Sequence, residues 1–205
     1  MWQIIGKDLA KQYNQRTIFQ HLSFEIQSGE SLVLIGPNGA GKTTLIRTVC
    51  NLQRADAGQI NFFRDGKEQS PEQLYSVIGL VGPYLQLYNQ LTALENFTFF
   101  AKIRGLTVDI SHFKFLMAKF GLINREWDEL RTFSSGMLQR MKYVCALLHQ
   151  PEILILDEPT SNLDDAGTEI VYQLINEQKA TKILIYATND SGEIAFGDKK
   201  IQLAA

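Results

Sequence analysis

Cysteine is scarce in this chain, which has only two among its 205 residues. Cys50 and Cys145 lie far apart in apolar surroundings, at a spacing that fits neither a zinc site nor a redox pair. So few cysteines exclude a small scaffold held together by disulfides. We expect both thiols to pack as small apolar groups in a reducing compartment.

A charge excess and a long apolar run are also missing. The 20 basic and 22 acidic residues give a net charge of -2, so we expect no strongly basic surface for nucleic acid or anionic lipid. No secretory signal precedes Gln3, and no apolar stretch reaches the roughly 18 residues that span a bilayer. We therefore expect a soluble, cytoplasmic chain. Its 205 residues suit one domain with room for an inserted lobe.

Four short apolar runs predict the buried strands of an α/β fold. The last two runs flank Asp164 to Gln178, where apolar residues recur at helical spacing, and this predicts a parallel strand, helix and strand unit. The predicted strands are Leu32 to Ile35, Val77 to Val81, Ile153 to Leu156, and Ile183 to Tyr186.

The segments outside these four strands predict helices in the middle of the chain and a second sheet near the amino terminus. In the middle of the chain, Thr92 and Glu95 form a capping box, and an apolar stripe predicts a helix from about Ser135 that ends before Pro151. Near the amino terminus, alternating stretches predict a small antiparallel sheet made of Trp2 to Ile5, Leu22 to Ile26, and Gln59 to Arg64.

A glycine-rich segment that ends in Lys-Thr follows the first apolar strand and opens a helical stretch. Successive backbone N–H groups in such a loop form an anion nest, the glycines leave room for phosphate, and the helix adds its positive amino end. Lys42 is expected to reach the β- and γ-phosphates, and the Thr43 hydroxyl to bind Mg²⁺. The alternative is a Gly-rich turn with no ligand. The segment comprises Gly36, Pro37, Asn38, Gly39, Ala40, Gly41, Lys42 and Thr43, with Thr44 as a further candidate.

Polar side chains follow the next two buried strands. Asp157 and Glu158 come at the carboxyl end of a strand, where open α/β sheets bind their ligands. Asp157 is expected to hold Mg²⁺ through water, and Glu158 to orient or deprotonate the attacking water. Asn189 follows the neighbouring strand and should lie near the γ-phosphate, unless that strand end only meets solvent.

Further segments complete a resemblance to the ATP-binding subunits of ABC transporters. FSSGM at residues 133–137 resembles the LSGGQ signature of that family, and SNLD at residues 161–164 resembles the loop after its catalytic glutamate. Tyr13 lies where an aromatic stacks on adenine in the family, although it could be an ordinary sheet aromatic. The resemblance implies an α/β fold: a P-loop NTPase core with a parallel sheet, an N-terminal antiparallel β subdomain and an inserted α-helical subdomain.

The same resemblance implies how the chain is divided and assembled. Residues 1–205 would form one domain, with 1–84 and 150–205 in the core and β subdomain and about 85–149 in the helical subdomain. ATP and Mg²⁺ would be clamped in a head-to-tail homodimer, or with a paired ABC subunit. One copy would supply the phosphate loop and the other Ser134, Ser135 and Gly136. These residues open a helix and offer anion donors, and since each phosphate loop already cradles its own phosphate, a second donor set fits best in trans.

Integral membrane subunits would be the other partners that the family implies. ATP hydrolysis would power transport through these subunits, and binding to them would hold the chain at the inner face of the cell membrane. Nucleic acid would have no role. Residues 80–96 would form a groove for a helix of the membrane subunits. The aromatic rings of Tyr84 and Tyr88 in this segment could equally pack internally.

Three positions depart from the pattern of the family. Asn189 stands where His is common, and an amide can donate to the γ-phosphate but cannot relay a proton, so slower hydrolysis is expected. Pro83 stands where a metal-sensing Gln is common, and Gln86 could replace that ligand or be an ordinary loop residue. Ser135 keeps its backbone N–H, whereas Met137 loses a polar contact.

Several sequence segments make the resemblance more specific. RTIFQHLSFEIQSGE, ADAG and LTALENFTFF resemble the ATP-binding subunit of the haem exporter of cytochrome c maturation, although antibiotic and polysaccharide exporters share much of it. A regulatory module that binds ATP but hydrolyses it poorly is the alternative that Pro83 and Asn189 leave open. An ABC ATPase that acts on DNA would need a long coiled-coil insertion, and one that acts on the ribosome would usually carry two cassettes. The sequence shows neither feature.

Overall fold

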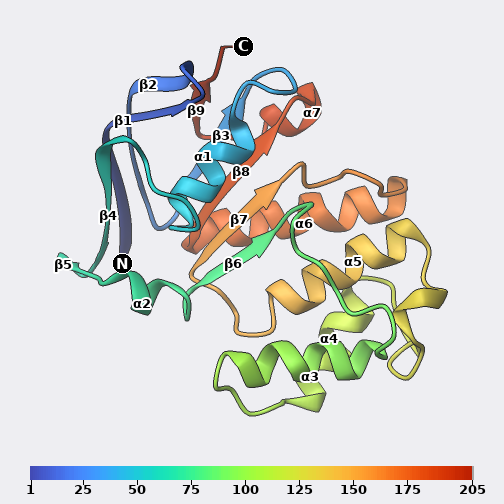
Figure 1. The fold of residues 1–205 in the computed structure, drawn as a ribbon. Coiled ribbons are helices and arrows are strands. Elements are labelled where there is room, and N and C mark those ends of the chain that lie inside the picture. The colour runs from blue at the N-terminus through green and yellow to red at the C-terminus, as the bar shows by residue number, and fades with distance from the viewer. Residues whose placement is uncertain (205) are drawn as a thin grey trace.

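The chain folds into two sheets with helices between and around them (Figure 1), as a computed structural model that describes residues 1–204 shows. An antiparallel sheet has the order β2-β1-β4-β5, and a parallel sheet has the order β6-β7-β8-β3-β9. The expected α/β core with an amino-terminal antiparallel sheet is therefore confirmed. The strands are β1 (Trp2–Tyr13), β2 (Arg16–Gln27), β3 (Ser31–Ile35), β4 (Ala57–Arg64), β5 (Lys67–Glu68), β6 (Ile78–Val81), β7 (Ile153–Asp157), β8 (Ile183–Thr188) and β9 (Lys199–Gln202).

The parallel sheet is covered on both faces, which is why its strands are apolar throughout. Every residue of β7 and β8 is buried. Because side chains alternate between faces, Leu154 and Leu156 join one apolar core with α5 and α6, while Ile153 and Ile155 join the other with α1. The helices are α1 (Lys42–Val49), α2 (Pro71–Leu74), α3 (Ala93–Ile103), α4 (Ile110–Lys119), α5 (Ser135–Ala146), α6 (Asp165–Thr181) and α7 (Ser191–Ile194), with a 3-10 turn at Leu130–Thr132.

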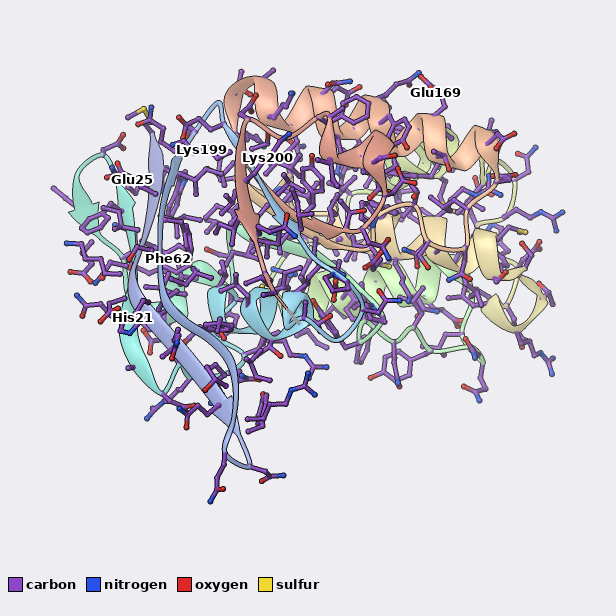
Figure 2. The ribbon with its side chains drawn as sticks, turned by 90° about the horizontal axis from the view of Figure 1, so that it is seen from above. His21, Glu25, Phe62, Glu169, Lys199 and Lys200 are labelled. Carbon is purple, nitrogen blue, oxygen red and sulfur yellow. The ribbon has the colours of Figure 1, made fainter. Side chains whose placement is uncertain are left out.

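The antiparallel sheet is larger than the sequence pattern indicates. Its first two strands form a hairpin in which Tyr13 pairs with Arg16, and the two loop residues, Asn14 and Gln15, both have positive φ. Two-residue loops of that kind match the twist of paired strands. The two sheets also meet at β9, where Lys199 Nζ donates to Glu25 O of β2 at 2.9 Å (Figure 2).

Helices α3, α4 and α5 form a helical segment beside the parallel sheet (Figure 1). The predicted capping box is confirmed: Thr92 Oγ1 accepts from Glu95 N at 3.2 Å, and Glu95 Oε2 accepts from Thr92 N at 2.8 Å. Helix α5 begins at Ser135 as predicted but ends at Ala146, two residues before the apolar stripe does. Both cysteines are buried and free, as expected.

Membrane-spanning helices are not a feature of residues 1–204. No helix there combines the length and the apolar character that crossing a bilayer requires.

Candidate functional site

The phosphate loop connects β3 to α1 and depends on glycine at two backbone positions. Gly39 and Gly41 have φ of 84° and 98°, in the left-handed region that side chains disfavour. A Cβ on Gly41 would also lie 2.3 Å from Ile18 Cγ2 of β2. Lys42 is buried at the start of α1, and its Nζ donates to Gly36 O at 2.7 Å. The loop therefore closes around the lysine, and at Gly41 it leaves no room for a side chain.

Thr43 and Asp157 form the next part of the site. Thr43 Oγ1 donates to Asp157 Oδ2 at 2.7 Å, which joins α1 to the end of β7. Asp157 is only 2% exposed, and its Oδ1 is buried with no hydrogen-bond partner in the described chain. Burial raises the pKa of the Asp157 carboxyl, and the Thr43 hydroxyl opposes this shift. A hydroxyl and a carboxylate with a free buried oxygen suit Mg²⁺, so these residues fit the expected metal.

Glu158 is held in an unusual backbone conformation at the same edge of the sheet. Its φ is 55°, which is uncommon for a residue other than glycine and costs about 1–3 kcal/mol. Its N–H donates to Ala187 O of β8 at 3.0 Å, and its Oε1 lies 3.4 Å from Lys42 Nζ. The backbone turn thus aims a partly exposed carboxylate at the phosphate loop rather than along the strand.

Asn189 meets the phosphate loop from the next strand. Strand β8 lies between β7 and β3, so its carboxyl end reaches the edge from which the phosphate loop departs. Asn189 Nδ2 donates to Asn38 Oδ1 at 3.3 Å. The strand end therefore faces the loop, although the catalytic role of the side chain remains a prediction.

Tyr13 lies at the tip of the β1–β2 hairpin and is 46% exposed. Its hydroxyl donates to Gln53 Oε1 at 2.6 Å, and Lys11 Nζ lies 5.4 Å from the ring centroid. The facing strand contacts the phosphate loop through Ile18. An exposed ring near that loop suits the predicted adenine contact better than a core aromatic would, and the contact stays a prediction.

Gln86, the predicted substitute for a metal-sensing glutamine, lies in the segment between β6 and α3. The side chain is exposed, and its role as a metal ligand stays a prediction. Tyr84, which the sequence pattern did not single out for the site, packs on α1: Arg47 of that helix lies 5.0 Å from its ring centroid. Burial, with the nearby charge of Asp157 among the lesser causes, raises the pKa of Tyr84.

The signature residues form a separate polar end of the molecule. Ser134 caps α5, its hydroxyl oxygen accepting from Met137 N at 3.2 Å, and both Ser134 and Ser135 are exposed. A Cβ on Gly136 would lie 3.1 Å from Asn162 O, so the signature packs against the loop after Glu158. In Figure 1 the amino end of α5 lies well away from the phosphate loop before α1.

A phosphate loop that faces an acidic strand end on a parallel sheet defines a P-loop nucleotide-binding protein. The comparison with protein families is more specific, because the family described as ABC transporter matches residues 19–161. The chain therefore belongs to the ATP-binding proteins of the ABC transporter family.

Several curated proteins are similar to the chain over most of its length. The linearmycin resistance ATP-binding protein LnrL of Bacillus subtilis (strain 168) is 35% identical over 93% of this chain and 62% of its own length. The lantibiotic transport ATP-binding protein SrtF of Streptococcus pyogenes is 35% identical over 87% of this chain and 76% of its own. The bacitracin transport ATP-binding protein BcrA of Bacillus licheniformis is 34% identical, over 89% and 60%. The chain thus spans about three-fifths of two of these relatives.

Solved structures agree on the fold. A structure titled as an ATP-binding subunit of an ABC transporter superposes with a TM-score of 0.83 at 29% identity, covering 98% of this chain and 85% of that one. A putative ABC transporter ATP-binding protein from Pyrococcus furiosus has the same TM-score at 21% identity, which supports the fold alone. The relatives' names refer to linearmycin, lantibiotics and bacitracin, so the haem-export expectation gains no support from them.

Proposed function

We propose that this chain is the ATP-hydrolysing subunit of an ABC transporter and works as a head-to-tail dimer, with a second copy or a paired ABC subunit. The observation that carries the proposal is that two ends suited to anions lie apart on one chain. The phosphate loop meets Thr43 and Asp157 at one end, and the exposed start of α5 presents Ser134 and Ser135 at the other. One chain cannot close both ends on one nucleotide, whereas two chains can.

The site residues divide the chemistry among them. Lys42 and the N–H groups of the phosphate loop would bind the β- and γ-phosphates, and Thr44 would extend that contact. Thr43 and Asp157 would hold Mg²⁺, which supplies positive charge against the phosphate oxygens. Glu158, 3.4 Å from Lys42, would orient and deprotonate the attacking water. Asn189 would donate its amide N–H to the γ-phosphate.

An apolar groove is the proposed docking site for the membrane subunits. It has a volume of about 710 Å³ and runs between the helical segment, with Phe100 and Ile103, and the edge of the parallel sheet, with Ile78 and Leu80. Tyr84 lies in the groove and also packs on α1, so an occupant would touch a residue next to the nucleotide site. A helix of a membrane subunit fits such a groove and would hold the chain at the inner face of the membrane.

For the cargo, the named relatives favour antibiotics and peptides over haem. The selection itself would belong to the membrane subunits rather than to this chain.

The decisive experiment measures ATP-driven dimerisation with hydrolysis blocked. Glu158→Gln with magnesium ATP should form a dimer in small-angle X-ray scattering, and adding Ser135→Glu should weaken the dimer at least about tenfold, because a carboxylate would face the partner's γ-phosphate. Ser111→Glu is the matched control, since Ser111 is exposed in the first turn of α4. If the chain stays monomeric, or both serine variants behave alike, the head-to-tail arrangement is wrong.

A nucleotide-gated regulatory module is the second candidate, and Asn189 and Pro83 favour it. The two candidates differ in turnover. The regulatory module would be favoured if Glu158→Gln forms the dimer while the wild-type chain hydrolyses almost no ATP, even with its membrane subunits present.

A further inference from the structure

Glu193 is a buried carboxylate that the proposed chemistry does not use. It lies in the short helix α7 and is 1% exposed. Its backbone is held by Tyr186 of β8, whose Oη donates to Glu193 O at 2.8 Å. A glutamate is almost never buried so completely without a partner, so its contacts indicate what it does.

The carboxylate of Glu193 contacts the loop that follows Glu158. Thr160 Oγ1 donates to Glu193 Oε1 at 2.5 Å, and Thr160 is only two residues after Glu158. The same loop is held from the other side by Tyr143 of α5, whose hydroxyl donates to Pro159 O at 2.7 Å. Glu193 therefore holds this loop through a hydrogen bond that its buried carboxyl group accepts.

The other neighbour of Glu193 is the loop that carries Asn189. Thr188 directly precedes Asn189, and its hydroxyl favours the charged form of Glu193 without forming a well-aligned hydrogen bond to it. Instead, Thr188 Oγ1 accepts from Asp190 N at 2.9 Å. Glu193 Oε2 is buried without a hydrogen-bond partner in the described chain. Burial raises the pKa of Glu193, and Asp190 adds to the shift.

We propose that Glu193 is a positioning residue, which holds the loop that carries Glu158 against the loop that carries Asn189. The inference rests on the proposed function, since these two side chains are assigned there to the water and the γ-phosphate. Beyond the strand pairing of Asp157 with Ala187, Glu158 N donates to Ala187 O near the site. Without the carboxylate the two side chains would lose their fixed separation, while the phosphate loop would keep its own contacts.

The test separates kcat from KM. Glu193→Ala should lower kcat for ATP by about 10- to 100-fold, a range typical of small misplacements in a site, with KM changed less than about twofold. Glu193→Gln keeps an oxygen that accepts from Thr160 and should retain kcat within about threefold. Thr160→Val should resemble Glu193→Ala, and the double variant should be no worse than either single one, because both remove the same contact. Glu169→Ala, on the outer face of α6 (Figure 2), is the control.

Hydrogen exchange gives a readout that does not require hydrolysis. In Glu193→Ala the amides of Glu158 and Ser161 should exchange at least about tenfold faster, whereas the amide of Leu45 in α1 should be unaffected. Unchanged exchange and unchanged kcat would overturn the proposal. A fall in kcat that matches a rise in KM and is not rescued by Glu193→Gln would show that Glu193 only stabilises the fold. If the wild-type chain does not hydrolyse ATP, the proposed function fails, and exchange still decides the role of Glu193.

Discussion

Asn189 at the end of β8 donates through Nδ2 to Asn38 Oδ1 in the phosphate loop, over 3.3 Å. The bond joins residues 151 positions apart in the sequence, and it places an amide at the edge of the sheet where Lys42 and Glu158 meet. An amide side chain neither gains nor loses a proton near neutral pH, so this position would act by hydrogen bonding alone. That difference can be measured.

Replacing Asn189 should slow hydrolysis if its amide reaches the γ-phosphate. Asn189→Ala is expected to lower the single-turnover rate about 100-fold, the scale seen when one donor to a developing charge is removed. Asn189→Asp should be at least as slow, because a second negative charge would face the phosphate. Asn176→Ala, exposed on α6, controls for the loss of a surface amide. Unchanged rates in both Asn189 variants would mean that the side chain is not at the γ-phosphate.

Removing the Thr43 hydroxyl should weaken magnesium binding. Thr43→Val deletes the donor to Asp157, and the Mg²⁺ concentration for half-maximal hydrolysis should rise about 10- to 100-fold, as is common when groups that support a metal are lost. Thr48→Val in the same helix is the matched control, because that hydroxyl donates only to Thr44 O. Equal magnesium curves for the two variants would remove Thr43 from the metal site.

A charge in the groove should weaken binding to the proposed membrane subunits. Ile103 is 67% exposed and lines the groove, and Ile123 is 62% exposed but does not. Ile103→Glu should reduce recovery of the chain with washed membranes at least about tenfold, because a buried carboxylate would be left unpaired. Basal ATP hydrolysis should be unchanged. Ile123→Glu should behave as wild type, and a matching loss there would place the docking site elsewhere.

His149 should make the fold less stable in mild acid. Burial, followed by the charge of Arg104, lowers the pKa of His149 to about 4, and its Nε2 lies 3.1 Å from Ile78 O. The unfolded chain binds this proton near pH 6.5 and the folded chain only near pH 4. The free energy of unfolding therefore falls as pH drops through this window, by about 2 kcal/mol for this partly buried group.

The measurement compares urea unfolding at pH 7 and at about pH 4.5. His149→Gln keeps a donor for Ile78 O but cannot gain a proton, so its loss of stability over this range should be smaller than that of the wild-type chain. His21→Gln, at an exposed position of β2 (Figure 2), is the control. If His149→Gln loses as much stability as the wild-type chain, the buried ring is not responsible.

Local patterns of the sequence determined the elements and the residue types of the site. Apolar runs predicted β7 and β8 because strands covered on both faces need no polar side chain, and the capping box at Thr92 fixed the start of α3. The phosphate loop was evident from its glycine spacing, and Gly39 and Gly41 adopt positive φ values that other residues disfavour. These signals lie within a few residues of one another, where local sterics and hydrogen bonding dominate.

The tertiary structure decided which distant residues meet. The order β7-β8-β3 brings Asn189 to Asn38. The packing of α7 against the loop after Glu158 brings Glu193 to Thr160. The fold also brings Tyr84, after the edge strand β6, to Arg47 of α1. None of these contacts has a periodic signature, since each depends on strand order and on long-range burial rather than on neighbours along the chain.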